Sequence, residues 1–129
     1  MILCGVGATP CWAPDAIVAN AVNPGGVATG LQKHVPQETL DSWQEAAAAG
    51  DGTSKTPQQG AAITLVAAVA PEFATTGGHY LDDGNEVPVI ANDADTRLMA
   101  QGVRAWAVDP DTARRLWDIS LDLTGGVRR

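Results

Sequence analysis

Side chains able to act as acids, bases or nucleophiles are few in this sequence of 129 residues. Tyr80 is its only tyrosine, and a tyrosine works as a general acid near neutral pH only when a cation lowers its pKa from about 10. The nearest lysine along the chain is Lys55, which nothing in the sequence brings close to Tyr80. Ser42, Ser54 and Ser120 lack the glycine-rich turn that exposes a nucleophilic serine. The sequence therefore predicts no catalytic residue.

Metal-ligating side chains are also sparse. Cys4 and Cys11 have no further cysteine as a partner, so we expect inert thiols. His34 and Glu38 have the i, i+4 spacing of metal ligands on a helix, but no second pair accompanies them, and a solvated helix entry is the simpler interpretation. Residues 82–86 lack the alternating ligands of a calcium loop and indicate an acidic turn. No metal site is predicted.

A glycine motif near the start invites a different interpretation. Residues 5–10 read Gly-Val-Gly-Ala-Thr-Pro, which is close to the GxGxxG pattern of dinucleotide-binding loops. Pro10 replaces the third glycine, and Pro14 interrupts the helix whose N-terminus would hold a pyrophosphate. We therefore treat the motif as a false positive and expect residues 1–15 to be an irregular lead-in.

The rest of the chain shows an α/β order of elements. Residues 17–22 are apolar at nearly every position, which favours a strand buried on both faces, and residues 23–26 end it with a turn. We expect helices at 37–49 (capped by Gly50), 56–70 and 109–125, a second strand at 77–81, and a helical turn near 96–101. Helices between two strands of the same sense require a parallel sheet. Two strands form a marginal sheet, so the pattern indicates the end of a larger fold.

Two of these helices carry strong signals at their ends. Thr56 is an expected N-cap, followed by a proline at the first helical position and a capping-box glutamine, Gln59. This helix is apolar on most sides and should be buried against the sheet. Asp109 and Pro110 begin the last helix, whose apolar residues line one face until Gly125.

Charge and hydropathy exclude several classes of partner. Eight basic and 15 acidic residues give a net charge of −7, which disfavours nucleic acid and anionic membranes. The longest apolar run, at residues 61–70, falls well short of the roughly 20 residues of a membrane span. We expect neither a membrane span nor a signal peptide, and two isolated cysteines favour a cytoplasmic location.

Four segments together resemble one enzyme family. The sequence AVNPGGVAT at residues 21–29 follows an apolar strand, and KTPQQGAA at residues 55–62 begins a helix. The sequence GGHYLDD at residues 77–83 marks a short strand, and DPDTARRLWDISLDLTG at residues 109–125 forms the last helix. In this order the segments resemble the C-terminal part of short-chain dehydrogenases/reductases, in the branch similar to retinol dehydrogenases and WW-domain oxidoreductases. The resemblance implies an incomplete Rossmann-like fold, the C-terminal part of a doubly wound parallel sheet with two strands and three or more helices.

The resemblance also implies a role for the turn after the first strand. Its cofactor-binding residues would be Pro24, Gly25, Gly26, Val27 and Thr29, and the cofactor would be NAD or NADP. Pro24 and Gly25 would shape the turn. The backbone of Val27 would meet the nicotinamide carboxamide, and the Thr29 hydroxyl would reach the carboxamide or the pyrophosphate. Glycine permits close backbone approach, and a hydroxyl can donate or accept a hydrogen bond.

The departures from the family pattern shape the functional hypothesis. The glycine-rich phosphate loop and the Ser and Tyr-x-x-x-Lys set are absent from these 129 residues. We expect residues 1–15 to be a lead-in and residues 16–129 to be the C-terminal portion of a Rossmann-like oxidoreductase domain, truncated and inactive alone. Such an enzyme would act on a small carbonyl or alcohol substrate, with residues 30–50 as a lid over the substrate. The alternative is a non-catalytic interaction module that associates through the helix at 56–70 and the strand at 79–81, as a homo-oligomer or with a complementing chain of the family.

Overall fold

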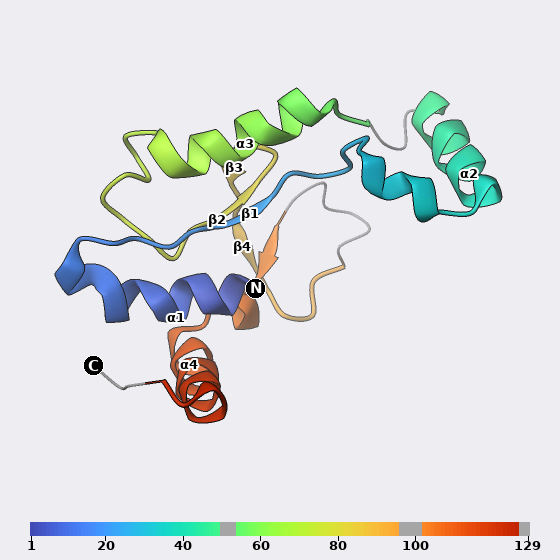
Figure 1. The fold of residues 1–129 in the computed structure, drawn as a ribbon. Helices are drawn as coiled ribbons and strands as arrows, with labels where there is room; N and C mark the ends of the chain where they lie inside the picture. Colours follow the sequence, from blue (N-terminus) through green and yellow to red (C-terminus); the bar gives the residue numbers. More distant parts are fainter. Residues whose placement is uncertain (50–53, 96–101, 127–129) are drawn as a thin grey trace.

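The computed structural model describes residues 1–49, 54–95 and 102–126 (Figure 1). Its α-helices are α1 (Ile2–Trp12), α2 (Gln37–Ala48), α3 (Pro57–Val69) and α4 (Pro110–Thr124). Its strands are β1 (Ala21–Asn23), β2 (Tyr80–Asp82), β3 (Asn85–Glu86), β4 (Val89–Ile90) and β5 (Val103–Arg104). Short 3₁₀ helices are η1 (Ala13–Asp15), η2 (Gly30–His34) and η4 (Ala105–Ala107).

The parallel pairing expected from the sequence is confirmed. β1 pairs in parallel with β2, with Ala21 opposite Tyr80 and Asn23 opposite Asp82. Both strands are shorter than predicted because Gly78, at a φ of +85°, interrupts the ladder on one side. The backbone still pairs there irregularly, since the Gly78 amide donates to the Ala19 carbonyl at 2.8 Å.

The prediction of only two strands was wrong. β3 adds an antiparallel strand to β2, so the main sheet has the order β1-β2-β3, and β4 and β5 form a second, parallel pair. Asp83 and Gly84 have φ values of 53° and 81°, the left-handed pair that a two-residue type I′ hairpin requires. The predicted acidic turn is therefore the tight corner between β2 and β3. The added strands have two residues each, which is too short for a periodic signal in the sequence.

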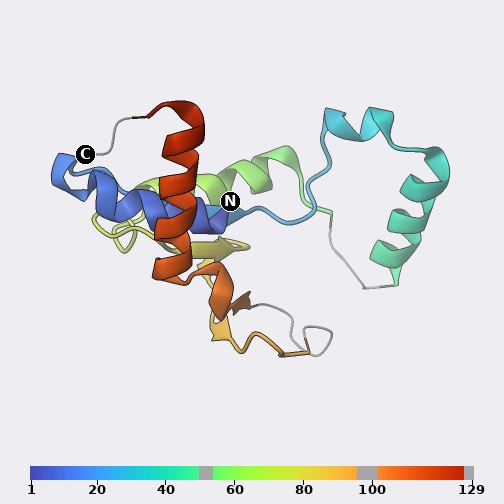
Figure 2. The ribbon, with the colours of Figure 1, turned by 90° about the horizontal axis from the view of Figure 1, so that it is seen from below.

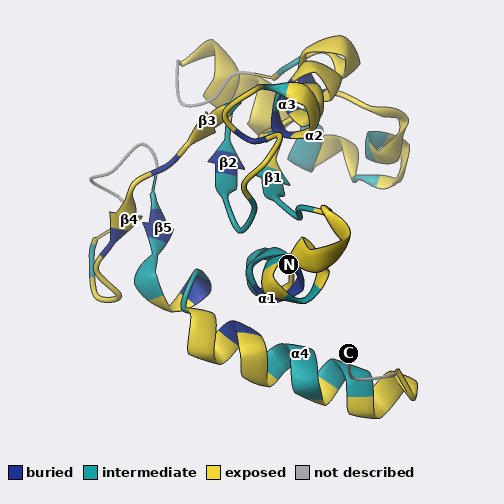
Figure 3. Ribbon diagram, turned by 90° about the vertical axis from the view of Figure 1, so that its left-hand side faces the viewer, coloured by how far each residue is buried: buried dark blue, intermediate teal, exposed yellow. Residues whose placement is uncertain are grey.

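The expectation that residues 1–15 are irregular was wrong. Ile2–Trp12 is an α-helix despite Pro10 in its last turn. Figure 3 shows α1 between the strands and α4, a position that buries part of its surface. Gly7 permits close contact with α4, because a Cβ there would lie 2.9 Å from the Ala113 carbonyl oxygen. The rings of Trp12 and Trp117 meet edge to face at 5.4 Å. Tertiary packing thus outweighs the helix-breaking residues, and the glycines of the GxGxxG-like segment belong to a helix rather than to a phosphate loop.

The main sheet is covered by helices on both faces, as in a doubly wound α/β fold (Figure 3). α3 lies on one face, α1 lies on the other, and α4 lies across α1 (Figure 2). The core under α3 consists of Ala67, Phe73 and the fully buried Leu81. A second cluster, Val87, Val103 and Ala107, lies where the second pair of strands meets the domain.

The helix ends follow the sequence signals. The Thr56 hydroxyl accepts from the Gln59 amide at 3.3 Å, while the Gln59 side chain accepts from the Thr56 amide at 2.8 Å, which completes the capping box. The Asp109 carboxylate caps α4, and Gly125 ends it with a φ of +66°. The predicted Gly50 cap and the predicted helical turn near 96–101 lie outside the described residues.

The expectation that α3 is buried on most sides was wrong. Only Gly60, Ile63 and Ala67 of this helix are buried, whereas Leu65 is 60% exposed and Val69 is 70% exposed. The short sheet covers one face of α3 and leaves the other uncovered. Every helix in the described parts of the chain is too short or too polar to span a bilayer.

Candidate functional site

The turn that follows β1 lies at the carboxyl end of a parallel strand, the edge at which open α/β sheets bind ligands. Asn23 organises the turn, because its Oδ1 accepts from the Gly25 amide at 3.2 Å and its Nδ2 donates to Asp82 at 3.1 Å. Gly25 has a φ of +71°, which favours glycine at this position. The sequence Asn-Pro-Gly therefore bends the chain sharply away from the sheet.

Beyond the turn, the backbone runs beside the residue that precedes α3. The Lys55 amide donates to the Gly26 carbonyl and the Ala28 amide donates to the Lys55 carbonyl, both at 2.9 Å. In this parallel bridge the two bonds use the neighbours of Val27, so the amide and carbonyl of Val27 point away from Lys55. The Val27 side chain packs against Gly60, where a Cβ would lie 2.8 Å from Val27 Cγ2. The predicted cofactor contact needs a Val27 side chain that is held in place and a Val27 amide that points away from Lys55, and the structure has both.

Thr29 begins the next element. Its hydroxyl oxygen accepts from the Leu31 amide at 3.3 Å and caps η2, which leaves the hydroxyl proton available to another acceptor. Thr29 is exposed. The sequence-predicted role of a donor toward a ligand is therefore compatible with its role as a helix cap.

A cavity of about 930 Å³ lies between this segment and the η2–α2 region. Its lining includes Gly26, Val27 and Thr29, whereas Pro24 and Gly25 do not contribute to it. The apolar face of α2 supplies Leu40, Trp43, Ala46 and Ala47, and further lining residues are Ala28, Leu31, Gln32, Val35, Gln44, Ser54 and Lys55. Trp43 is 51% exposed, so the apolar face of α2 lines the cavity instead of packing into a core. Figure 1 shows α2 set apart from the sheet.

Lys55 is a site residue that the sequence reasoning missed. Its Nζ lies 3.2 Å from the Asp83 carboxylate and its side chain is only 17% exposed. The available signal was its place directly before the N-cap of α3, but nothing in the sequence indicated that the hairpin corner at Asp83 would lie opposite.

Tyr80 is not activated as an acid. It packs beside the Val87, Val103 and Ala107 cluster, and burial together with the negative charge of Asp82 raises its pKa above the usual value of 10.0. Among the described residues, no interaction joins Tyr80 to a lysine or an arginine.

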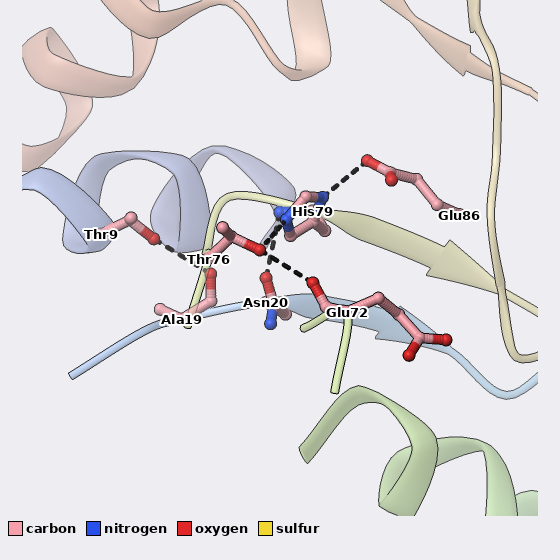
Figure 4. A network of polar contacts seen from close by, with 7 residues as sticks. All are labelled: Thr9, Ala19, Asn20, Glu72, Thr76, His79 and Glu86. Atoms are coloured by element: carbon pink, nitrogen blue, oxygen red, sulfur yellow. Dashed lines mark hydrogen bonds and ion pairs between the residues drawn. The ribbon is translucent and has the colours of Figure 1, made fainter. Parts of the chain in front are cut away.

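His79 belongs to a polar network between the α3–β2 connection and β3 (Figure 4). Its Nδ1 lies 2.7 Å from Glu86 and its Nε2 lies 2.9 Å from the Thr76 hydroxyl, while Asn20 accepts from its backbone amide at 3.1 Å. Both ring nitrogens therefore have protein partners. Within the described ranges no group of three or more His, Cys, Asp or Glu side chains could hold a metal, and Cys4 and Cys11 are free thiols.

Known proteins resemble this chain over most of its length. It is 38% identical to a probable oxidoreductase of Streptomyces lividans over 115 residues, which are 86% of this chain and 38% of that protein. It is 41% identical to a short-chain dehydrogenase/reductase of Penicillium rubens over 100 residues, which are 78% of this chain and 28% of that protein. The chain belongs to the short-chain dehydrogenase/reductase family. A more distant member is human retinol dehydrogenase 14, at 28% identity over 116 residues.

Membership of the short-chain dehydrogenase/reductase family confirms the resemblance seen in the four segments and the partial Rossmann-like fold. The chain corresponds to the family's C-terminal part and spans 38% and 28% of the lengths of its Streptomyces and Penicillium relatives. No protein-family profile and no solved structure matches it.

Proposed function

We propose that residues 24–29 form the nicotinamide-facing wall of an NAD(P) site in a short-chain dehydrogenase/reductase. The observation that carries this proposal is the outward main chain of Val27 at the carboxyl end of β1, beside a cavity of about 930 Å³. Pro24, Gly25 and Gly26 shape the turn, Val27 offers an amide and a carbonyl to the carboxamide, and Thr29 offers a hydroxyl. When bound, the dinucleotide supplies hydride-transfer chemistry. The residues present fit such a group because the main chain of Val27 points away from its bridge to Lys55, while the Val27 side chain packs against Gly60.

The substrate side of this proposal rests on the cavity. Its walls are mainly apolar, with Leu40 and Trp43 on α2 and Leu31 on η2. Such walls favour an apolar alcohol or carbonyl compound. The relative named retinol dehydrogenase 14 is named for an alcohol, which agrees with this class. The proposed lid role of residues 30–50 is supported by those of its described residues that line the cavity, from Leu31 to Ala47.

The proposal includes inactivity of the 129 residues alone. Reduction of a carbonyl requires a proton donor next to the substrate oxygen. The only tyrosine of this chain, Tyr80, has a raised pKa and no partner lysine within the described part of the chain. The Ser and Tyr-x-x-x-Lys set and the glycine-rich loop would have to come from another polypeptide segment. The cytoplasmic location of this protein stays a prediction.

Amide NMR spectra of the chain test the cofactor wall. Titration with NAD⁺ or NADP⁺ should shift the amide signals of Val27, Ala28 and Thr29, whereas ADP, which lacks nicotinamide, should not. Thr29→Val should weaken the response and Thr75→Val, at an exposed threonine elsewhere, should not. Absence of shifts at residues 27–29 in the unmodified chain would refute the assignment.

Activity tests address the missing machinery. The chain mixed with NADPH and a panel of aldehydes and ketones should give no turnover. A chimera that joins the N-terminal part of the Streptomyces lividans relative to this chain should turn over apolar carbonyl compounds. Robust turnover by the chain alone would contradict the proposed division of roles.

A second candidate function is a non-catalytic interaction module. The uncovered face of α3, with Leu65 and Val69 exposed, favours it, because exposed apolar faces promote association. A homo-oligomer or a complex with a complementing chain would cover this face. Light scattering should show association that Leu65→Ser and Val69→Ser reduce and that Gln58→Ser, at an exposed polar position of α3, leaves unchanged.

A further inference from the structure

Lys55 joins three segments at the carboxyl edge of the sheet. Its backbone bridges residues 26–28 of the turn, and the next residue, Thr56, caps α3. Its ammonium group lies 3.2 Å from the carboxylate of Asp83 in the β2–β3 corner. One residue therefore contacts the turn, the start of α3 and the hairpin.

The contact with the turn is close. A Cβ placed on Gly25 would lie 2.6 Å from Lys55 Nζ, so the ammonium occupies the space that any side chain at position 25 would need. Gly25 thus serves two purposes, because it adopts a positive φ and admits the lysine. The ammonium rests directly against the bend that aims Val27.

The hairpin corner is itself tied to the turn. The Asp83 amide donates to the Asn23 carbonyl at 3.3 Å, and Asp83 has a φ of 53° that fixes its position in the tight corner. Asp83 is half exposed whereas Lys55 is mostly buried, so the ion pair is the polar contact that holds the lysine head at this edge.

We propose that Lys55 is a positioning residue that fixes the turn at residues 24–29 through its ion pair with Asp83 and its contact with Gly25. That the turn binds the nicotinamide of NAD(P) rests on the proposed function. The role of Lys55 in holding the turn in one conformation does not depend on it. Without the ammonium, the bend at Gly25 loses the group that lies against it and the Val27 main chain is no longer aimed in one direction.

Hydrogen exchange of single amides tests whether Lys55 fixes the turn at residues 24–29. The Ala28 amide, bonded to the Lys55 carbonyl, should exchange about fivefold faster in Lys55→Met, the size expected for loss of a partly exposed ion pair. Amides in the middle of α4 should keep their rates, and the control Lys33→Met, at an exposed lysine of η2, should change neither region. Unchanged Ala28 exchange in Lys55→Met would overturn the proposal.

Asp83→Asn provides a second route if Lys55→Met does not fold. It should accelerate Ala28 exchange to a similar degree, and the double variant should exceed neither single variant, because both remove one interaction. Additive effects, or no effect of Asp83→Asn on Ala28, would show that the ion pair does not position the turn.

A cofactor readout separates positioning from general stability. In Asp83→Asn, the NADP⁺ concentration for half-maximal shift of the Val27 amide should rise about fivefold while the thermal midpoint changes little. A fall in thermal midpoint with unchanged NADP⁺ response would indicate a merely structural ion pair and contradict the proposal. If the unmodified chain shows no NADP⁺ response, the proposed function fails, and the exchange of Ala28 still decides the role of Lys55.

Discussion

Replacement of Leu81 by alanine tests whether the sheet and α3 share one core. Leu81 is 0% exposed in the middle of β2 and packs with Phe73 and Ala67. Truncation of a fully buried leucine costs about 2–5 kcal/mol, depending on how far the site can collapse. Because several neighbours are alanines and half-buried valines, part of the space can close, and we expect about 3 kcal/mol.

Urea unfolding followed by tryptophan fluorescence and by circular dichroism at 222 nm measures this loss. A cost of about 3 kcal/mol is a large fraction of the roughly 5–15 kcal/mol that stabilises an ordinary domain, and it should lower the thermal midpoint by about 10 °C. Leu123→Ala is the matched control, since Leu123 is 82% exposed on α4 and should cost about 0.5 kcal/mol or less. A cost below about 1 kcal/mol for Leu81→Ala would refute the packing of β2 under α3.

Three further changes test separate features. Gly7→Val should destabilise the chain by about 1–3 kcal/mol in urea unfolding, because a Cβ at Gly7 would meet the backbone oxygen of Ala113, whereas an irregular start would tolerate it. Thr56→Ala should cost about 1 kcal/mol by thermal unfolding through loss of the hydroxyl that caps α3, and Thr56→Ser should restore most of it. Tyr80 should ionise above pH 10 in an absorbance titration, since burial raises its pKa. Its contribution to the stability of the fold should be complete below the unfolded pKa of about 10 and should be lost as the pH rises through the folded pKa. Tyr80→Phe should remove that loss of stability at high pH.

Local signals made three helices predictable. α2, α3 and α4 begin and end within about a residue of their expected bounds. For α3 and α4 the reason is the capping side chains of Thr56 and Asp109, which act on the adjacent turn alone. The parallel pairing of β1 with β2 was also predictable, from an apolar run, a turn and crossover helices. The signals for these features come from residues close together in the sequence, although β1 and β2 themselves are far apart along the chain.

Features that depend on contacts between distant residues could not be predicted from the sequence. α1 contains Pro10 and two glycines, and it is helical because it lies between the sheet and α4. Lys55 and Asp83 meet only because the crossover brings the start of α3 beside the β2–β3 corner. The turn at residues 24–29 was identified through a family resemblance, whereas the direction of the Val27 amide required the bridge to Lys55.

The contact between α1 and α4 bears on the order of folding during synthesis. Ile2–Trp12 leaves the ribosome long before Pro110–Thr124, yet Gly7 and Trp12 find their partners Ala113 and Trp117 only on that last helix. A nascent chain therefore exposes the α4-facing side of α1 until Pro110–Thr124 has been translated. Contacts between segments so far apart slow folding and lengthen the time in which apolar surface can aggregate. Chaperone demand for this chain should be greatest just before α4 emerges.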